Sequence, residues 1–379
     1  MNKLLCLLML GCILVAGCEP PRNVEVKAPA AATLPTIGML EVVAELSHNP
    51  GNITVTKDNR IFVSLHQFRN CPARLVEVTG KDQITPWPNA QWNAEPGSGP
   101  DVMNAVLGVQ LDAQGKWLWA LDNGQCNPAQ PPKLLAFDVA TGALAYRHNF
   151  PTEVAPAGTF LNDLAVDSDR GFVYIADIGG ILKSALVIVD VNKQESWRFT
   201  GHPALEAEAI DMVIAGHTMM TKDLDGKPHT ARIGVNPITL SPDCETLYFG
   251  AMSSTNWWSV PTELLRSKQE FATIAAAIKK AGPKTISDGA STDAEGNHYF
   301  TAVCDNSIFT LTTQGELKRL VRDERISWPD AISFGADSWL YFVANQLHLS
   351  PPLNDGVEGG KPPYLIMRVW TGTKGIPGR

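Results

Sequence analysis

The stretch NDLAVDSDRGFVYIAD, residues 162–177, decides the fold of this chain. Two short apolar and aromatic runs flank a turn rich in Asp and Gly, a pattern typical of two strands joined as a hairpin. The same pattern recurs five more times, as NITVTKDNRIFVSL (52–65), GVQLDAQGKWLWALD (108–122), NPITLSPDCETLYFGA (236–251), DGASTDAEGNHYFTA (288–302) and DAISFGADSWLYFVA (330–344).

The spacing of these six copies predicts a β-propeller. They start roughly 40–75 residues apart, and a four-stranded propeller blade needs about 40–50 residues, so the excess would form loops. Segments between the copies, such as KLLAFDV (133–139) and ALVIVDV (185–191), would supply the outer strands. We therefore predict an all-β, six-bladed propeller over residues 37–371, followed by a flexible tail over residues 372–379.

One segment breaks the β pattern. In PTELLRSKQEFATIAAAIKKAG (261–282) the apolar residues lie near helical spacing, and Gly282 ends the run. We predict a helix here, inserted between blades four and five. Two longer irregular stretches, 86–100 and 204–232, are expected to cover one mouth of the central channel, because long loops in compact domains are usually functional.

The composition excludes some classes of partner. The chain has 379 residues, a net charge of −8 and no Lys/Arg cluster, so nucleic acid is not an expected partner. The acidic balance mildly favours cationic ligands. We expect a monomer that binds a small molecule.

The N-terminus is typical of a targeting segment. Lys3 precedes an apolar run that is too short to span a membrane and ends in LVAGC (14–18). This ending resembles a bacterial lipoprotein signal, which implies removal of residues 1–17 and lipidation of Cys18. Residues 18–36 are rich in Pro and Ala, as in an extended tether. We therefore expect an extracytoplasmic protein anchored through Cys18, in the outer membrane if the cell has one.

Four cysteines remain beyond that anchor. Their even number suits an oxidising compartment, and none forms a CxxC pair typical of zinc or redox sites. From their places in neighbouring blades we predict the disulfides Cys71–Cys126 and Cys244–Cys304. Four buried thiols are the alternative.

Several motifs together resemble one known family. GVNPITLSPDCETLYFGAMSS (234–254), VPTELLR (260–266), KTISDGASTDAEGNHYF (284–300) and SWPDAISF (327–334) are similar, in order and spacing, to the yellow/major royal jelly protein family in its bacterial form. The resemblance covers about residues 40–370 and implies a six-bladed propeller, more distantly related to the gluconolactonase/regucalcin propellers. It leaves function open: some members resemble dopachrome-converting enzymes, some bind biogenic amines, and others have no assigned activity.

A ring of polar residues is predicted at one end of the channel. Aligning the copies by their turns places one position at the start of each innermost strand, where five copies carry Asn52, Asn162, Asn236, Asp288 and Asp330. The second copy has Leu107 there, with Asn104 three residues earlier. Asp163, beside Asn162, is either a ligand contact or a strand cap. Such residues often only cap neighbouring backbone, so a purely structural role is the alternative.

Converging carboxylate and amide oxygens also suit a hard cation such as Ca²⁺. In the gluconolactonase-like propellers, matching positions hold a divalent metal, and the resemblance carries this role to Asn162, Asn236 and Asp288. Those enzymes add a Glu from the first blade, where this chain has Asn52. The site should therefore bind Ca²⁺ or another divalent cation more weakly.

Two histidines, His66 and His348, follow inner strands and could act as acid or base at the channel mouth, as could Asp288. Our leading interpretation is a tethered propeller that binds a small polar or aromatic molecule there, with Asn52, Asn104, Asp163 and Asp330 as contacts. The alternatives are a metal-assisted lactonase, a dopachrome-type tautomerase and a non-catalytic envelope module. No G-x-S-x-G, H-E-x-x-H or nucleotide-binding loop is present.

Overall fold

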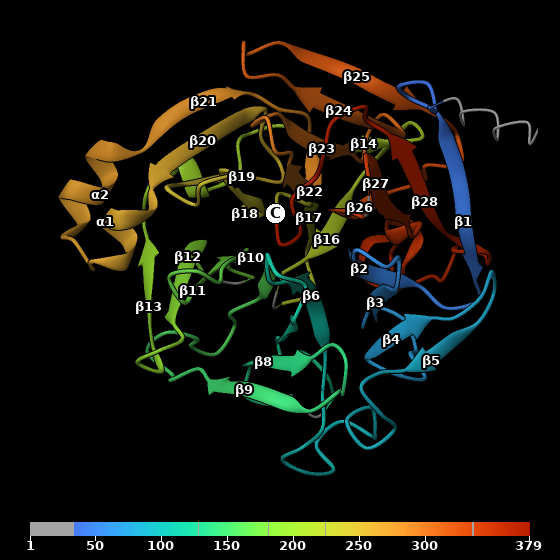
Figure 1. The fold of residues 1–379 in the computed structure, drawn as a ribbon, viewed down its shortest axis with the longest axis horizontal. Coiled ribbons are helices and arrows are strands. Elements are labelled where there is room, and N and C mark those ends of the chain that lie inside the picture. The colour runs from blue at the N-terminus through green and yellow to red at the C-terminus, as the bar shows by residue number, and fades with distance from the viewer. Residues whose placement is uncertain (1–33, 128, 181, 224, 336) are drawn as a thin grey trace, which may run out of the picture. The chain divides into compact units, whose positions relative to one another are not determined.

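Six four-stranded antiparallel sheets surround a central axis in the computed structural model, which describes residues 34–379 except 128, 181, 224 and 336 (Figure 1). The lipid anchor predicted at Cys18 and nearly all of the tether lie outside the described residues. The strands nearest the axis are β2 (Pro50–Val55), β6 (Val106–Leu111), β10 (Leu161–Asp167), β18 (Val235–Leu240), β22 (Ser287–Thr292) and β26 (Pro329–Phe334).

Each inner strand pairs with the second strand of its predicted hairpin. These second strands are β3 (Ile61–Leu65), β7 (Trp117–Asp122), β11 (Phe172–Asp177), β19 (Thr246–Ala251), β23 (His298–Ala302) and β27 (Trp339–Ala344). We call the end of the channel where the inner strands begin the mouth, and the end with the six hairpin turns the turn end.

Two further strands complete each blade. The third strands are β4 (Leu75–Val78), β8 (Lys133–Asp138), β12 (Ala185–Asp190), β20 (Asn256–Pro261), β24 (Ser307–Leu311) and β28 (Tyr364–Trp370). The outermost strands are β5 (Ile84–Pro86), β9 (Leu144–Asn149), β13 (Glu195–Thr200), β21 (Lys279–Pro283), β25 (Leu317–Arg322) and β1 (Leu40–Leu46). The prediction of six blades is confirmed, and β1 closes the ring by pairing with β28 in the sixth blade.

The predicted helical segment forms two short helices, α1 (Thr262–Arg266) and α2 (Phe271–Ala277). They connect the third and fourth strands of blade four, because the last residues of the segment, from Lys279, pair with β20 as strand β21. None of the helices in the described part of the chain is both long and apolar enough to cross a bilayer.

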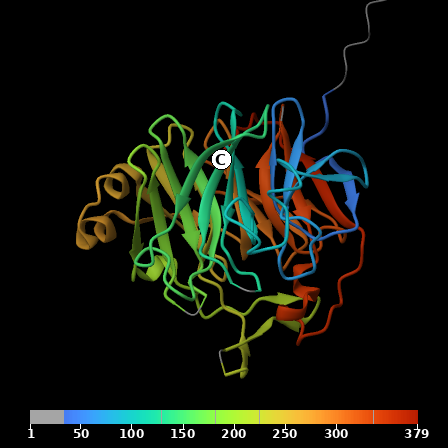
Figure 2. The ribbon, with the colours of Figure 1, turned by 90° about the horizontal axis from the view of Figure 1, so that it is seen from below.

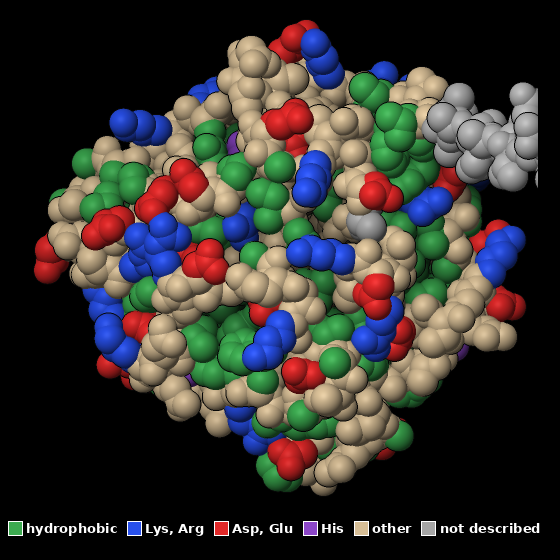
Figure 3. All heavy atoms as spheres, in the orientation of Figure 1, with side chains coloured by type: hydrophobic (Ala, Val, Ile, Leu, Met, Phe, Trp, Pro, Cys, Tyr) green, Lys and Arg blue, Asp and Glu red, His purple; other side chains and the backbone are tan. Residues whose placement is uncertain are grey.

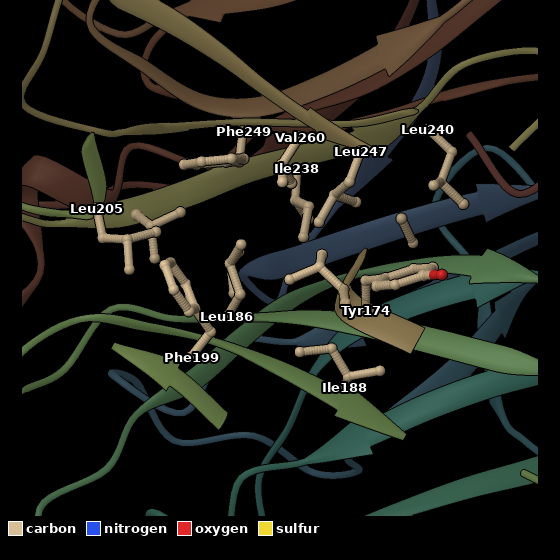
Figure 4. Packing of buried hydrophobic residues seen from close by; sticks show 14 of the residues in the cluster. Tyr174, Leu186, Ile188, Phe199, Leu205, Ile238, Leu240, Leu247, Phe249 and Val260 are labelled. Atoms are coloured by element: carbon tan, nitrogen blue, oxygen red, sulfur yellow. The ribbon is translucent and has the colours of Figure 1, made fainter. Parts of the chain in front are cut away.

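Apolar side chains fill the spaces between neighbouring blades. Figure 4 shows one such cluster, where Leu186 and Phe199 of blade three meet Phe249 and Val260 of blade four. Each of these side chains is buried, and truncating a buried Phe to Ala costs about 3–5 kcal/mol. Inter-blade packing of this kind holds the inner strands at fixed positions around the channel.

The two predicted disulfides are absent: the four cysteines of the described chain, Cys71, Cys126, Cys244 and Cys304, form no disulfide. Cys244 lies in the β18–β19 turn at the turn end, whereas Cys304 follows β23 at the mouth. Cys244 and Cys304 therefore lie at opposite ends of the channel, a full strand length apart, which is too far for a disulfide. Cys71 and Cys126 both lie in loops on the mouth side, where the Cys71 thiol donates to the His66 carbonyl oxygen at 3.1 Å.

Candidate functional site

A β-bulge interrupts all six inner strands just after their first residue. In every blade the first residue pairs with the second strand, the next two leave the ladder, and regular pairing resumes at the fourth. A bulge frees side chains from the ladder and re-aims them. The second residues, here called the ring positions, are Gly51, Leu107, Asn162, Asn236, Asp288 and Asp330.

Close approach of neighbouring inner strands explains the small residues at the third position of two bulges. A Cβ on Gly108 would lie 2.4 Å from the carbonyl oxygen of Asn162, and one on Gly289 would lie 2.7 Å from that of Asp330. Glycine therefore permits the contact between adjacent blades that a side chain would prevent.

Four of the polar residues predicted for the ring occupy equivalent ring positions, namely Asn162, Asn236, Asp288 and Asp330. Blade one differs by one residue, because Gly51 holds the ring position and Asn52 follows it. In blade two Leu107 holds the ring position. Asn104 instead accepts from Gly97 N at 2.8 Å and has no place in the cavity wall.

A cavity of about 690 Å³ opens at the mouth over these ring positions. Its apolar and aromatic walls include Phe68, Phe160, Trp328 and Leu347. Part of the predicted covering insert lines it as well, through Thr221, Lys222, Asp223, Asp225, His229, Ala231 and Arg232. This insert forms two hairpins, β14 (Val213–Ile214) with β15 (His217–Thr218) and β16 (Met220–Lys222) with β17 (Pro228–Thr230).

The hairpins lie on one side of the ring, next to the short 3₁₀ turns η2 (Leu347–Leu349) and η3 (Pro351–Leu353) (Figure 2, lower edge). Strand β16 contacts η3. The other predicted insert, residues 86–100, takes no part in the cavity wall. Its Trp87 and Trp92 pack against Phe137 between blades one and two.

Asp288 is the best-satisfied carboxylate of the site. The Asn236 amide donates to Oδ1 at 2.6 Å, and the Trp328 indole N–H donates to Oδ2 at 2.7 Å. Asn236 in turn accepts from the Asn162 amide. Trp328 has φ of +50°, an uncommon conformation for a bulky residue. The indole is thus held in place to donate to this carboxylate.

Two more carboxylates face Asp288. Asp330 accepts from the Asn345 amide at 2.6 Å through Oδ2, and Asp163 accepts from the Asn52 amide at 2.8 Å through Oδ1. Each therefore has one side-chain donor and one oxygen with no side-chain donor among the described residues. The sequence left the role of Asp163 open, and the structure places it in the cavity wall.

None of the three carboxylates forms an ion pair within the described chain, although 19 ion pairs occur elsewhere in it. Burial, followed by repulsion from Asp288, raises the pKa of Asp163 well above its usual value. Burial and both neighbouring carboxylates do the same to the pKa of Asp330. Burial raises the pKa of Asp288 to about 6, against its two hydrogen-bond donors. Lys222 and Arg232 line the same cavity, but Arg232 pairs with Asp211, so within the described chain the acidic cluster is not compensated by an ion pair.

The predicted metal ligands Asn162, Asn236 and Asp288 are adjacent and joined by hydrogen bonds. They bring one carboxylate and two amides, a low ligand charge for a hard divalent cation. The described residues contain no group of three or more His, Cys, Asp or Glu arranged to hold a metal ion. The divalent-metal site stays a prediction.

Of the two predicted histidines, only His66 lines the cavity. Its Nδ1 accepts from Phe68 N at 3.2 Å, and burial lowers its pKa to about 3. The ring is thus neutral with its proton on Nε2, and its ability to accept a proton is weak. His348 stacks on Trp328, with ring centroids 6.0 Å apart, outside the cavity wall.

Several residues of the site gave no clear signal in the sequence. Trp328 and Asn345 flank the sixth repeat, and Phe68 and Phe160 lie in irregular loops. The pairing of Trp328 with Pro329 and Asp330 in the motif SWPDAISF was the strongest available hint.

Comparisons with known proteins agree with this architecture. The model of the family described as major royal jelly protein matches residues 104–350, more than half of the chain. The chain belongs to the major royal jelly protein family. It is 30% identical over 300 residues to the yellow-related salivary protein LJM11 of Lutzomyia longipalpis, covering 69% of each chain.

Royal jelly proteins of Apis mellifera also match. Major royal jelly protein 1 is 29% identical over 227 residues, which is 55% of this chain and 49% of that protein. The chain thus spans about half the length of the royal jelly proteins that it matches.

Solved structures support the fold alone. A luciferin-regenerating enzyme superposes with a TM-score of 0.55 at 11% identity, over 90% of this chain and 98% of the other. A gluconolactonase from Xanthomonas campestris gives 0.52 at 13% identity, over 87% and 89%. These two structures support the predicted similarity to gluconolactonase-like propellers in fold.

Proposed function

We propose that this member of the major royal jelly protein family binds a small organic monocation with an aromatic or apolar body at the mouth of its channel. The observation that carries the proposal is the uncompensated cluster of Asp163, Asp288 and Asp330 in the floor of the cavity. Buried charges in proteins are normally paired, and no basic side chain of the described chain forms an ion pair with this cluster, which favours a cation as the ligand.

The charge of the cluster favours a monovalent ligand. Burial raises the pKa of all three carboxylates, and repulsion between them raises the pKa of Asp163 and Asp330 as well, so the cluster disfavours full ionisation. Ca²⁺ sites usually depend on several ionised carboxylates. An ammonium group has a single charge and three N–H donors, and Asp163 and Asp330 each have an oxygen that receives no side-chain donor in the described chain.

The rest of the cavity suits an apolar body. Gly51 and Leu107 leave blades one and two without a polar ring residue, and Phe68 and Phe160 belong to the loops that follow β3 and precede β10. An aromatic ring would pack there while its ammonium group faces Asp163 of blade three and Asp330 of blade six. Pockets of this size typically bury most of a small ligand.

A matched pair of ligands tests the proposal. Isothermal titration calorimetry should show binding of 2-phenylethylamine to the full-length protein and at least about tenfold weaker binding of 2-phenylethanol, which lacks the charge. Equal affinity for both compounds, or no binding of either at about millimolar concentration, would rule out a cation site.

A Ca²⁺ titration of the same protein separates the metal alternative. Tight Ca²⁺ binding that competes with the amine would favour the metal-assisted interpretation, and hydrolysis of gluconolactone would then be the activity to measure. Amine binding that is unchanged by Ca²⁺ and by a chelator supports the monocation proposal.

A further inference from the structure

Residues 373–379 enter the channel from the end opposite the cavity. The side chain of Lys374 is exposed, but Gly378 and Arg379 are buried, with Arg379 only 4% exposed. The chain therefore runs inward from the surface. Its end lies near the axis in Figure 1, and in the upper half of the ring in Figure 2, away from the hairpins. The sequence suggested a flexible tail here, and the contacts described below correct that expectation.

Backbone contacts fix this segment to blade five. Lys374 O accepts from Ala294 N at 2.8 Å, and Gly375 forms a bridge with Asp293 in the β22–β23 turn. Deeper in the channel, the Ser291 hydroxyl donates to Arg379 O. The segment thus follows the inner strand β22 from its turn toward its middle.

Two glycines allow the segment to fit. A Cβ on Gly375 would lie 2.1 Å from the side chain of Phe334. Gly378 has φ of +81°, and its Cβ would lie 2.6 Å from Leu111 O. Both positions therefore require glycine, one for space and one for conformation and space.

The guanidinium group of Arg379 anchors the inner end. Nη1 donates to Val166 O at 3.0 Å, and Nη2 contacts Cys244 Sγ at 2.7 Å and Pro242 O at 3.5 Å. These partners come from blades three and four, and Leu111 from blade two. Within the described chain Arg379 forms no ion pair, so backbone oxygens and a thiol alone receive this buried cation.

We propose that the turn end of the channel is a binding site for a glycine–arginine peptide segment, and that residues 373–379 occupy it in cis as a plug. Because the plug closes the turn end, a ligand would enter the cavity through the mouth. None of the residues that contact the plug lines the cavity. This proposal does not depend on the ligand of the mouth.

The surface around the plug does not explain its binding by charge. Figure 3, drawn from the side of Figure 1, shows Lys and Arg interspersed with Asp and Glu on this face. Recognition must therefore come from the fit of the glycines and from the oriented acceptors around the guanidinium group.

Alkylation of Cys244 in the full-length protein tests the plug. This thiol is 5% exposed and lies against Arg379, so iodoacetamide should reach it only when the plug leaves. In Arg379→Ala, which removes the guanidinium contacts, we expect alkylation of Cys244 to become about tenfold faster. Lys374→Ala is the matched control, because only the backbone of Lys374 takes part.

The expected change has an unambiguous cause. Arg379 lowers the pKa of Cys244, although burial raises that pKa to about 11 overall, so removing the arginine alone would make the thiol less reactive. Faster alkylation would therefore report exposure. Cys304, at the mouth, serves as reference in the same digest. An unchanged rate at Cys244 in Arg379→Ala would overturn the plug.

Rebinding in trans tests the site itself. A protein ending at Gly372 should bind the peptide TKGIPGR and should regain protection of Cys244, whereas the peptide with alanine in place of arginine should do neither. A truncated protein that folds but does not bind TKGIPGR would contradict the proposed peptide site. If the truncated protein does not fold, the alkylation rate of Cys244 in Arg379→Ala decides whether residues 373–379 act as a plug.

Discussion

The two ends of the channel are built from the same six strands, yet they differ in almost every property. At the mouth the ladder of every inner strand is broken by a bulge, the ring positions vary from glycine to aspartate, and a cavity remains. At the turn end the ladders are regular, Asp side chains such as Asp112 and Asp293 cap the hairpin turns, and a segment of the chain fills the space. The residue types thus differ most between blades at the bulged positions, where backbone pairing does not constrain the side chain.

The largest effect should come from Asp288→Asn. Both Asp288 oxygens accept from N–H donors, so an amide here would turn its own NH₂ toward either Asn236 or Trp328. We expect roughly 100-fold weaker binding of 2-phenylethylamine, together with a lower melting temperature. Calorimetry and thermal unfolding would measure these changes.

Asp82→Asn, on the exposed surface, is the control for that variant. Retained affinity in a folded Asp288→Asn protein would break the assignment of the mouth as a cation site.

Asp330→Asn should have the opposite effect on stability. The substituted amide can keep its oxygen on the Asn345 amide and point its NH₂ into the cavity, while one buried charge disappears. We expect the free energy of unfolding to rise by on the order of 1–3 kcal/mol near neutral pH, even as amine affinity falls. Urea unfolding would measure it.

The pH dependence of that gain has a definite sign. The pKa of Asp330 is raised in the folded protein, so the folded state binds protons more tightly than the unfolded state, and this group destabilises the protein as pH rises. The wild type should therefore lose more stability between about pH 5 and pH 8 than Asp330→Asn does. Equal pH dependence in both proteins would argue against an uncompensated acidic cluster.

A smaller effect is expected from Phe160→Leu at the apolar wall. The variant keeps an apolar side chain but loses the aromatic face, so affinity for 2-phenylethylamine should fall about three- to tenfold. Affinity for an alkylamine such as n-butylamine should hardly change. A parallel loss for both amines would mean that the wall serves only as packing.

The smallest effect should come from Asp112→Asn at the turn end. Asp112 caps the β6–β7 turn by accepting from Lys116 N at 2.6 Å. We expect a loss of about 0.5–1 kcal/mol in stability and no change in amine affinity. An altered affinity would show that the two ends of the channel are coupled.

Much of the fold could be predicted from the sequence, because six hairpins with alternating apolar residues repeat around one axis. The ring was predicted for the same reason, since Asn162, Asn236, Asp288 and Asp330 occupy the same place in each repeat. Blade one was misaligned by one residue because a bulge shifts the register without leaving a mark in the sequence: Gly51, not Asn52, is the ring residue.

Other features depend on contacts between distant segments. Nothing local to Cys244 shows that it faces Arg379 across the channel, and this contact, rather than a disulfide with Cys304, fixes its environment. Likewise Trp328 gains its role only because blade six lies beside the Asp288 of blade five. The tail was expected to be free because its partners belong to five different blades.

The pairing of β1 with β28 has a consequence for the way in which the chain folds. The ion pair between Glu41 and Arg368 joins residues 327 apart in sequence, and the blue and red strands lie side by side in Figure 1. During synthesis, residues 40–46 must wait for nearly the whole chain before their partner strand exists. Blades one to five can form from local hairpins in the meantime. Ring closure is therefore the step with the highest contact order and should be the slowest to form.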